Sequence, residues 1–349
     1  MTGASREVGD PPDPDVVVVG AGPCGLAAAI SLGKAGFRTR IFDRDCVVSS
    51  ITQYPTYATF FSTAPRLSLG GLPFIISDAK PTRRDALAYY RGVVSHFALG
   101  VRQYELVDAI EPAVGGFVVR TRRRGGAPRE TRAKAVVVAT GYWGSPNRLG
   151  VSGEDLPHVS HAWREGHHAF QQPVVVVGGG NSAAEAALEL WRAGAQVTLT
   201  HFGPTFDKKI KPWILPDIEN RIAEGSIAAR WDRRVAGIEP DGVILRSPDG
   251  TEERIRADHV YLLTGFAPNV DLLRDSGVPI DAATGIPQHD ADTFETTVPN
   301  LFIAGVVVAG YDANKVFIEN GRYHGDRIVA RLLGRPAPEM PGVSRDLDS

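Results

Sequence analysis

The sequence predicts an α/β protein with two similar three-layer domains, the second inserted in the first. Two stretches carry this prediction, because each runs from consecutive valines directly into closely spaced glycines: Val16 to Gly25 and Pro173 to Ala183. Consecutive valines are typical of a strand buried on both faces of a parallel sheet. The third observation is that other apolar strands end in Thr-Gly or Ala-Gly, at Gly141, Gly265 and Gly305.

The first stretch has the spacing of a dinucleotide-binding turn. Gly20-Ala-Gly22-Pro-Cys-Gly25 follows the valines. A segment with high helix propensity then continues to Ala35, and the next strand ends at Asp43, 18 residues after Gly25. Gly20 suits the tight turn, Gly22 lets the backbone approach a pyrophosphate, and Gly25 lets helix and strand pack closely. The helix N-terminus offers N–H groups to phosphates, and Asp43 can accept from ribose hydroxyls. We therefore predict a Rossmann-like dinucleotide site.

The second stretch repeats the pattern with one difference. Gly178-Gly-Gly180-Asn-Ser-Ala183 opens a helix, and after the next strand the position equivalent to Asp43 holds His201. An acid there binds a ribose 2′-OH and repels a 2′-phosphate, whereas a histidine removes that repulsion and can hydrogen-bond to a phosphate. Three lysines follow closely, at positions 208, 209 and 211. These features favour NADPH over NADH.

Two such units in one chain indicate two dinucleotides, and the common chemistry that needs both is hydride transfer from a nicotinamide to a flavin. We expect FAD at the first unit and NADPH at the second. The predicted FAD-binding residues are Gly20, Gly22, Pro23, Cys24, Gly25, Asp43, Arg44, Thr140, Gly141, Gly305, Asp312 and Ala313. The predicted NADPH-binding residues are Gly178, Gly180, Asn181, Ser182, Ala183, His201 and Lys209.

The predicted FAD-binding domain is discontinuous, with residues 15–150 and 268–335, and residues 151–267 form the NADPH-binding domain. Residues 1–14 and 336–349 are predicted to be flexible tails. Residues 145–172 hold His158, His161, His167 and His168, without a cysteine or a helical spacing that would place two on one face. We expect solvated histidines in a linker and no metal site.

Several further segments have local signals. Residues 82–99 and 315–333 are predicted to be helices, the second one amphipathic with its N-terminus toward the flavin. Residues 120–129 are predicted to form a basic hairpin tip, since a nucleic-acid patch would need aromatic residues between the charges. The aromatic, hydroxyl-rich stretches 51–63 and 69–74 are either packed surface loops or a lining for a flat aromatic ligand.

Composition fits an ordinary globular enzyme. Hydrophobic residues make up 43% and charged residues 22%, and the formal net charge of -2 gives no electrostatic basis for binding nucleic acid or an anionic membrane. No apolar run reaches the roughly 18 residues of a membrane span, and the polar first 14 residues lack a signal-peptide core. Two cysteines form no disulfide framework, so we expect a cytoplasmic protein. A symmetric homo-oligomer is the expected assembly.

The order of motifs resembles the two-dinucleotide flavoprotein reductases of the thioredoxin-reductase-like group. Within that group it is most similar to the bacillithiol disulfide reductase family, also described as the YpdA or bacilliredoxin reductase family. Besides the two glycine motifs, the resemblance rests on Thr59-Phe-Phe-Ser-Thr63, Gly70-Gly-Leu-Pro-Phe74, Lys211-Pro-Trp-Ile-Leu-Pro-Asp217 and Asp312-Ala-Asn-Lys-Val-Phe-Ile-Glu-Asn-Gly321. It covers about residues 15–335.

The resemblance implies an enzyme that uses NADPH and FAD to reduce bacillithiol disulfide, a small-molecule substrate, and that acts beside a bacilliredoxin-like protein. It also implies that Cys24 is the redox thiol. The wider group differs in two respects: this chain has no Cys-x-x-Cys or Cys-x4-Cys pair, which excludes a dithiol relay within one chain, and Val306 stands where many relatives have an aspartate. Asp312 is the candidate replacement for that aspartate.

The chemistry of Cys24 has two interpretations. A helix N-terminus stabilises a thiolate by about 0.3–1 kcal/mol, which would lower the thiol pKa, while a neighbouring pyrophosphate would oppose this. Alternatively, Cys24 is a small residue that fills a tight turn. Cys46, after the second strand, is expected to pack.

Three other functions share parts of this pattern. A flavin monooxygenase would carry a Phe-x-Gly-x-x-x-His linker, whereas this linker contains Pro157-His-Val-Ser-His161. A ferredoxin or flavodoxin reductase would need a basic docking face, for which only residues 120–129 qualify. A flavin-dependent redox sensor with negligible turnover is the third alternative.

Overall fold

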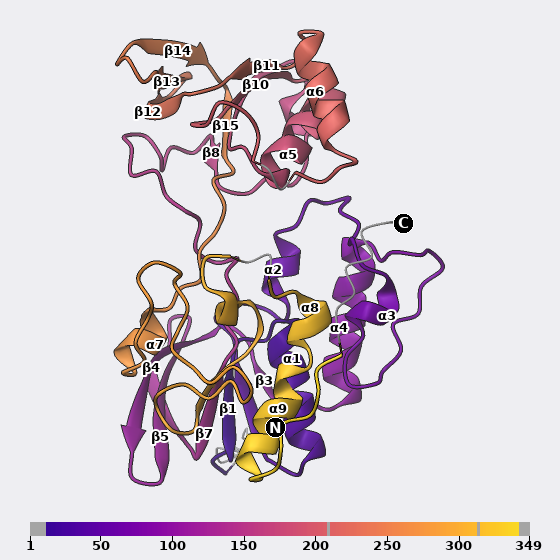
Figure 1. The fold of residues 1–349 in the computed structure, drawn as a ribbon, viewed down its shortest axis with the longest axis vertical. Helices are drawn as coiled ribbons and strands as arrows, with labels where there is room; N and C mark the ends of the chain where they lie inside the picture. Colours follow the sequence, from indigo (N-terminus) through magenta and orange to yellow (C-terminus); the bar gives the residue numbers. More distant parts are fainter. Residues whose placement is uncertain (1–11, 208–209, 313–314, 342–349) are drawn as a thin grey trace, which may run out of the picture. The chain divides into compact units, whose positions relative to one another are not determined.

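The computed structural model describes residues 12–207, 210–312 and 315–341, which divide into two compact units. The first unit contains the described parts of Met1–Ser49, Phe61–Tyr142 and Pro268–Ser349, and the second contains Ser50–Phe60 and Trp143–Ala267 (Figure 1). The second unit is therefore inserted in the chain of the first. Each unit contains a five-stranded parallel sheet, which confirms the predicted α/β fold with a duplicated architecture.

The first unit is built around a parallel sheet with the strand order β16-β7-β1-β2-β3. Its central strand, β1 (Val16–Val19), is fully buried and pairs with β2 on one edge and β7 on the other. The elements of this unit are β1, α1 (Pro23–Lys34), β2 (Thr39–Phe42), α3 (Ala64–Leu67), α4 (Arg83–His96), β3 (Val101–Arg102), β4 (Glu105–Ala113), β5 (Gly116–Arg123), β6 (Pro128–Ala133), β7 (Ala135–Val138), α7 (Asp271–Asp275), β16 (Leu301–Ile303), the 3₁₀ turn η2 (Gly305–Ala309), α8 (Ile318–Gly321) and α9 (His324–Leu332).

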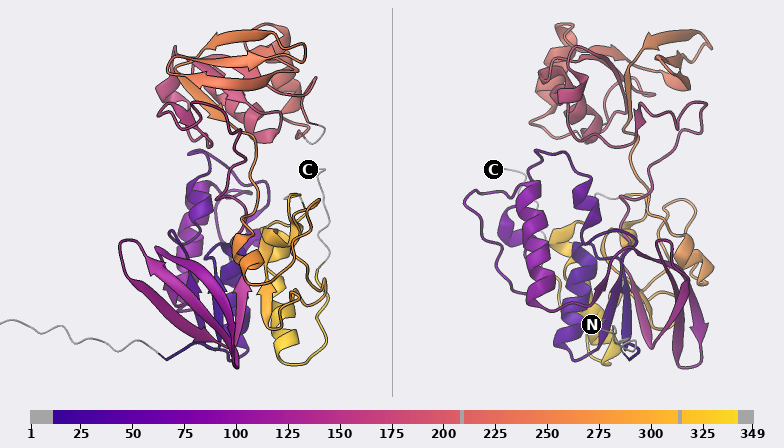
Figure 2. Two further views of the ribbon diagram at one scale, coloured as in Figure 1. Left: turned by 90° about the vertical axis from the view of Figure 1, so that its left-hand side faces the viewer. Right: turned by 180° about the vertical axis from the view of Figure 1, so that it is seen from behind.

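Alternate residues of β1 serve the two faces of the sheet. Val17 and Val19 pack with Ile110 and Phe117 of the antiparallel sheet β4-β5-β6, which covers one face. Helix α1 packs on the other side against β1, β2 and β7, and α9 packs on α1. Figures 1 and 2 show this order of layers within the unit: β4-β5-β6, then the parallel sheet, then the helices.

The second unit repeats the arrangement with the strand order β11-β10-β9-β15-β8. Val174 and Val176 of the central strand face the helical cluster, while Val175 and Val177 face the antiparallel sheet β12-β13-β14. Its elements are β8 (Val159–Ser160), η1 (His167–Ala169), β9 (Pro173–Val177), α5 (Asn181–Arg192), β10 (Gln196–Thr200), α6 (Leu215–Ala223), β11 (Ala228–Arg230), β12 (Arg234–Glu239), β13 (Gly242–Arg246), β14 (Glu252–Arg256) and β15 (His259–Leu262). The short helix α2 (Ser49–Thr52) spans the boundary of the two units in sequence.

Several features predicted from short stretches of sequence agree with the structure. Helix α4 begins after Thr82, whose hydroxyl accepts from the backbone N–H of Asp85 in a capping box. Arg120 to Arg129 spans the turn between β5 and β6, as expected for a hairpin tip. Phe74 is buried and its ring stacks on Tyr89 with centroids 4.1 Å apart, so the 69–74 stretch is a packed loop.

Residues 50–60 belong by contact to the second unit, although the sequence places them in the first domain. Arg164 accepts from the backbone N–H of Thr56 and donates through its guanidinium to Gln53. The Tyr54 ring lies 5.0 Å from that of Trp143. These contacts join segments about 110 residues apart, which explains why the sequence pattern does not reveal them.

The prediction of one helix over residues 315–333 is wrong. Helix α8 ends at Gly321 and α9 begins at His324. The chain follows the surface of α1 here, because a Cβ at Gly321 would lie 2.6 Å from the Cys24 sulfur and one at Gly325 would lie 2.6 Å from the Ala28 Cα. Close packing of two glycines against α1 thus outweighs the continuous helical pattern.

We expect Gly325→Ala to destabilise the protein by about 1–3 kcal/mol, because its methyl group must push α9 away from α1. The matched control is Gly33→Ala, also in a helix, where a Cβ meets nothing within 4 Å; it should stabilise by about 0.5–1 kcal/mol through helix propensity. Urea unfolding measures both free energies. Equal stabilities of the two variants would contradict the packing argument.

Candidate functional site

The glycine turn after β1 is shaped by two close backbone approaches. Gly20 has a φ of +110°, and a Cβ on it would collide with the carbonyl of Ala139. A Cβ on Gly25 would collide with the carbonyl of Gly20. Side chains are therefore excluded at both positions, which brings the first turn of α1 against the ends of β1 and β7 as the motif predicts.

Gly22 differs from its two neighbours, since a Cβ there would meet nothing within 4 Å. It is the N-cap of α1, and no side chain caps this helix end and no acidic residue stands in its first turn. An open backbone surface at an uncapped helix N-terminus fits a pyrophosphate. Packing does not require glycine at this position, so an approaching ligand is the remaining physical reason for it.

Asp43 connects the end of β2 to the same turn. Its Oδ2 accepts from the backbone N–H of Ala21 at 2.7 Å and its Oδ1 from that of Asp45 at 2.8 Å. Burial raises the pKa of this carboxyl group. The side chain thus holds β2 against the glycine turn, at the carboxyl edge of the sheet where nucleotide ribose binds in such folds. Arg44 is exposed and pairs with Asp45 at 3.5 Å.

Cys24 lies in the first turn of α1, in contact with two other segments. A Cβ at Gly321 would lie 2.6 Å from its sulfur, and one at Gly305 would lie 3.2 Å from it. Cys24 is half-buried, forms no disulfide, and burial raises the pKa of its thiol to about 12, with the charge of Glu319 acting in the same direction. A thiol with this raised pKa is protonated at neutral pH.

Strand β16 ends at Ile303, and Gly305, the first residue of η2, lies beside Cys24. The backbone N–H of Gly305 donates to Nδ1 of His324 at 3.2 Å, and the His324 ring stacks on Phe294 with centroids 4.0 Å apart. His324 is 2% exposed. Burial, together with the charges of His289 and Arg327, lowers its pKa to about 4. A neutral imidazole therefore fixes the backbone of Gly305.

The remaining predicted residues of this unit follow the strand ends. Thr140 is exposed and Gly141 has a φ of +69°, both just after β7. Asp312 is half-buried, with its carboxylate 3.9 Å from the Lys315 ammonium. Val306 is half-buried in η2. Ala313 lies outside the described residues.

The glycine turn of the second unit follows the same rules. A Cβ on Gly178, whose φ is +146°, would collide with the carbonyl of Leu263, just as Gly20 approaches Ala139. Gly180 is the N-cap of α5, and no side chain caps that end. The Asn181 side chain accepts from the backbone N–H of Lys211 at 2.9 Å and so anchors the 211 segment to the helix start.

His201 is buried beneath this turn. Its ring occupies the space where a Cβ on Gly179 would be, with ring atoms 2.5–2.6 Å from that position, and it is 5% exposed. Its Nε2 lies 3.7 Å from Asp207, yet burial lowers the pKa of the imidazole. Burial therefore opposes the positive charge that the sequence suggests for this residue. Lys208 and Lys209 lie outside the described residues.

The histidines of residues 145–172 are more structured than expected. Residues 159–160 form β8, and His161 is half-buried with Nε2 3.4 Å from Glu154. His168 is exposed and its Nε2 bonds to the Tyr261 hydroxyl at 2.8 Å. Within residues 12–207, 210–312 and 315–341, no three His, Cys, Asp or Glu side chains gather as a metal site would need.

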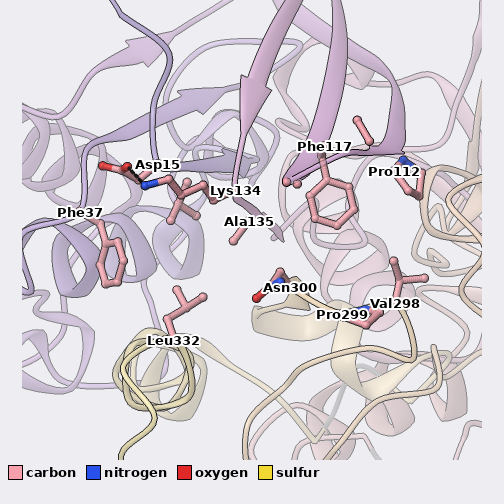
Figure 3. Close-up of a pocket in the computed structure, with 14 residues that line it drawn as sticks. Asp15, Phe37, Pro112, Phe117, Lys134, Ala135, Val298, Pro299, Asn300 and Leu332 are labelled. Carbon is pink, nitrogen blue, oxygen red and sulfur yellow. Dashed lines mark hydrogen bonds and ion pairs between the residues drawn. The ribbon is translucent and has the colours of Figure 1, made fainter.

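A cavity of about 620 Å³ lies at the opposite edge of the first unit's sheet (Figure 3). Its lining includes Val16 and Ala135, the first residues of β1 and β7, with the Asp15–Lys134 ion pair, Phe117 and Leu332 around them. Nucleotides bind at the carboxyl ends of parallel strands. This cavity is therefore separate from the predicted cofactor site.

Comparison with known proteins decides the family. The model of the pyridine nucleotide-disulphide oxidoreductases matches residues 17–305. The bacilliredoxin reductase Bdr of Bacillus subtilis (strain 168) is 41% identical over 321 residues, or 91% of this chain and 97% of that protein. The bacillithiol disulfide reductase Bdr (YpdA) from Bacillus cereus is 42% identical with a TM-score of 0.89, covering 92% of this chain and 99% of that one.

The chain belongs to the bacillithiol disulfide reductase family. The resemblance inferred from the sequence is thereby confirmed. The protein is a flavin-dependent disulfide reductase, and the predicted cofactors, FAD and NADPH, are confirmed as well. The thioredoxin reductase of T. acidophilum, 23% identical with a TM-score of 0.70 over 93% of this chain and 99% of that one, shares the fold. No described helix is long and apolar enough to cross a membrane.

The sequence patterns did not single out His324, Ser62 or Glu319. Helices α8 and α9, which carry Glu319 and His324, both contact α1, and Ser62 bonds to Glu319 across 257 residues of sequence. All three residues lie inside or next to the stretches on which the family resemblance rests. A resemblance of this kind points to a segment, but it does not identify which side chain in the segment has a function.

The buried His324 makes stability depend on pH. Its pKa is about 4 in the folded protein and about 6.5 when unfolded, so the unfolded state binds more protons between these values. Stability should therefore be fully present above pH 6.5 and fall by about 3 kcal/mol as pH drops to 4. His324→Asn, which keeps an acceptor for Gly305, should flatten this dependence.

Urea unfolding at pH 4 to 7.5 measures the effect. His167→Gln, at an exposed histidine, is the control and should leave the slope unchanged. An unchanged slope in His324→Asn would show that other groups cause the acid sensitivity.

Proposed function

We propose that this reductase transfers electrons from NADPH in the second unit, through FAD in the first, to a low-molecular-weight thiol disulfide of the bacillithiol type, with Cys24 as the redox thiol. The observation that carries the proposal is the position of Cys24. It stands inside the glycine turn, and its sulfur faces Gly305 and Gly321 at the carboxyl edge of the sheet. A thiol there lies beside the site proposed for the FAD pyrophosphate.

The proposal extends to the cofactor residues predicted from the sequence, and the geometry of the two glycine turns supports Gly22 and Gly180 among them. FAD is assigned to residues 15–150 and 268–335, with its pyrophosphate over Gly22, its ribose at Asp43 and its ribityl chain near Asp312. NADPH is assigned to residues 151–267, with its pyrophosphate over Gly180. Because burial lowers the pKa of His201, its proposed contact with a 2′-phosphate is a hydrogen bond and not a charge pair.

Because the glycine turn contains a single cysteine, the proposed reaction passes through a mixed disulfide between Cys24 and the substrate. When bound, FAD takes a hydride from NADPH and makes two electrons available for a disulfide. Cys24 attacks the substrate disulfide, forming a mixed disulfide and releasing one thiol. Two electrons and two protons, one proton from the transferred hydride and one from solvent, would then return Cys24 to its thiol form and release the second thiol. The sum is NADPH, one proton and one disulfide giving NADP⁺ and two thiols.

The proposal also includes a protein partner, a cellular compartment and an oligomeric state. A bacilliredoxin-like protein is the proposed protein partner, because the Bacillus subtilis relative is named as a bacilliredoxin reductase. Two free cysteines suit a reducing cytoplasm. A symmetric homo-oligomer remains the expected assembly.

Replacing Cys24 tests the redox role. Cys24→Ala should keep NADPH-dependent flavin reduction and lower NADPH oxidation driven by bacillithiol disulfide more than about 100-fold under argon, because the mixed disulfide cannot form. Cys46→Ala is the matched control and should retain turnover. Stopped-flow flavin absorbance and NADPH absorbance measure the two steps.

Each alternative function gives its own result in the same assay. Turnover that survives Cys24→Ala would make this cysteine structural. Oxidation of NADPH only with oxygen and an organic substrate would indicate a monooxygenase, and stimulation only by ferredoxin would indicate a carrier reductase. Glutathione disulfide in place of bacillithiol disulfide tests the choice of substrate.

Replacing Gly22 tests the proposed FAD turn. Gly22→Ala should leave apoprotein stability unchanged, because its Cβ meets nothing within 4 Å, yet weaken FAD binding at least about tenfold by standing between the helix N-terminus and the pyrophosphate. Gly92→Ala, in α4 with equally open surroundings, should leave FAD binding unchanged and stabilise the apoprotein by about 0.5–1 kcal/mol through helix propensity. Flavin titration and thermal unfolding separate the effects. Normal FAD affinity in Gly22→Ala would refute the assignment.

A further inference from the structure

The preference of the second unit for NADPH requires a positive charge that His201 does not supply. NADPH differs from NADH by a phosphate on the adenosine 2′ oxygen, and in such folds the residue after the second strand contacts this oxygen. Here that residue is His201, whose buried ring fills the space where side chains on Gly179 and Gly203 would be. Burial lowers the pKa of the imidazole, and Asp207, 3.7 Å from its Nε2, adds a negative charge nearby.

A second loop lies at the same edge of the sheet. Strands β10 and β11 are parallel neighbours, so the residues that follow them leave the sheet at the same carboxyl edge. Two backbone hydrogen bonds join these residues. The N–H of Arg233 donates to the carbonyl of His201 at 3.0 Å, and that of Asp232 donates to the carbonyl of Gly203 at 2.9 Å. The segment 231–234 is thus held directly beside His201.

Arg234 ends this segment, and its guanidinium packs on the ring of Phe202. The Arg234 Cζ lies 5.0 Å from the centroid of the Phe202 ring, and the ring centroids of Phe202 and His201 are 4.4 Å apart. Both Arg234 and Phe202 are exposed. A guanidinium stacked on an aromatic ring can still present its N–H groups at its edge, and these bind phosphate oxygens in pairs. A cation therefore stands one side chain away from His201.

Two other cations near this turn are already engaged. The Lys211 ammonium pairs with Glu185 at 2.8 Å. Arg233 donates through its guanidinium to two backbone carbonyls of its own segment. Arg234, in contrast, forms no ion pair with any residue that the structure describes. Its charge is therefore available to an anion.

We propose that Arg234, held on the ring of Phe202, binds the 2′-phosphate of NADPH and supplies the charge that the neutral His201 lacks. This inference rests on the proposed assignment of NADPH to residues 151–267. Arg234 thereby sets the preference for NADPH over NADH and takes no part in the hydride transfer.

Two adenosine nucleotides separate the 2′-phosphate from the rest of the cofactor. The probe 2′,5′-ADP carries both a 5′-phosphate and a 2′-phosphate, whereas 5′-AMP lacks the 2′-phosphate. Isothermal titration calorimetry of the FAD-loaded protein with each nucleotide measures binding without turnover. Low ionic strength keeps the contribution of an exposed charge measurable.

Arg234→Gln should weaken the binding of 2′,5′-ADP at least about tenfold, because a charge-assisted contact is lost, and should leave the affinity for 5′-AMP unchanged. Arg234→Lys should retain part of the affinity, since it keeps the charge without the paired N–H groups. Phe202→Leu should give a smaller loss, because the guanidinium loses the ring that holds it. Arg256→Gln is the control, at an exposed arginine on the opposite end of the sheet β12-β13-β14, and should change neither affinity.

The other outcomes overturn the inference. If Arg234→Gln binds 2′,5′-ADP normally, Arg234 does not contact the phosphate, and a loss in Lys209→Gln alone would assign the charge to that lysine. Equal losses for both nucleotides in Arg234→Gln would mean that Arg234 supports the adenosine and not its 2′-phosphate.

Failure of the proposed function is recognised separately with Gly180→Ala. The added Cβ would make only ordinary contact, 3.6 Å from the Asp207 carboxylate. It should weaken both nucleotides if the phosphate at the 5′ position lies over Gly180. If both bind normally to this variant, the assignment of NADPH to the second turn fails, whatever residue stands at position 234.

Discussion

The close approach of α1 to the sheet is the constraint on which the first unit depends. It exists only because Gly20 and Gly25 lack side chains where the backbone meets Ala139 and itself. Three further contacts follow from it. Asp43 reaches the N–H of Ala21, Gly305 comes next to Cys24, and Gly325 packs on Ala28. Segments from the beginning and end of the chain therefore meet along one helix, and Cys24 lies where they converge.

The second unit uses the same packing with a different residue after its second strand. Gly178 approaches the carbonyl of Leu263 as Gly20 approaches that of Ala139. In the first unit Asp43 holds the turn by a hydrogen bond to a backbone N–H. In the second, His201 supports the turn from below by van der Waals contact with Gly179. The two positions are equivalent in sequence, yet one side chain offers a carboxylate at the turn and the other is buried beneath it.

Most of the fold could be predicted from the sequence because its signals are local. Four valines followed by spaced glycines define strand, turn and helix within one segment, and Thr82 and Asp85 mark the start of α4. The site was predicted less completely, because its remaining features depend on distant contacts. Burial raises the pKa of the Cys24 thiol, and the packing of Gly321 and Gly325 against α1 interrupts the helix expected over residues 315–333.

The protonated thiol of Cys24 has a consequence for its reactivity toward oxidants. Peroxide oxidises thiolates to sulfenic acids and further to irreversible forms, and it reacts slowly with thiols of high pKa. Cys24 should thus react slowly with hydrogen peroxide, because burial keeps its thiol protonated.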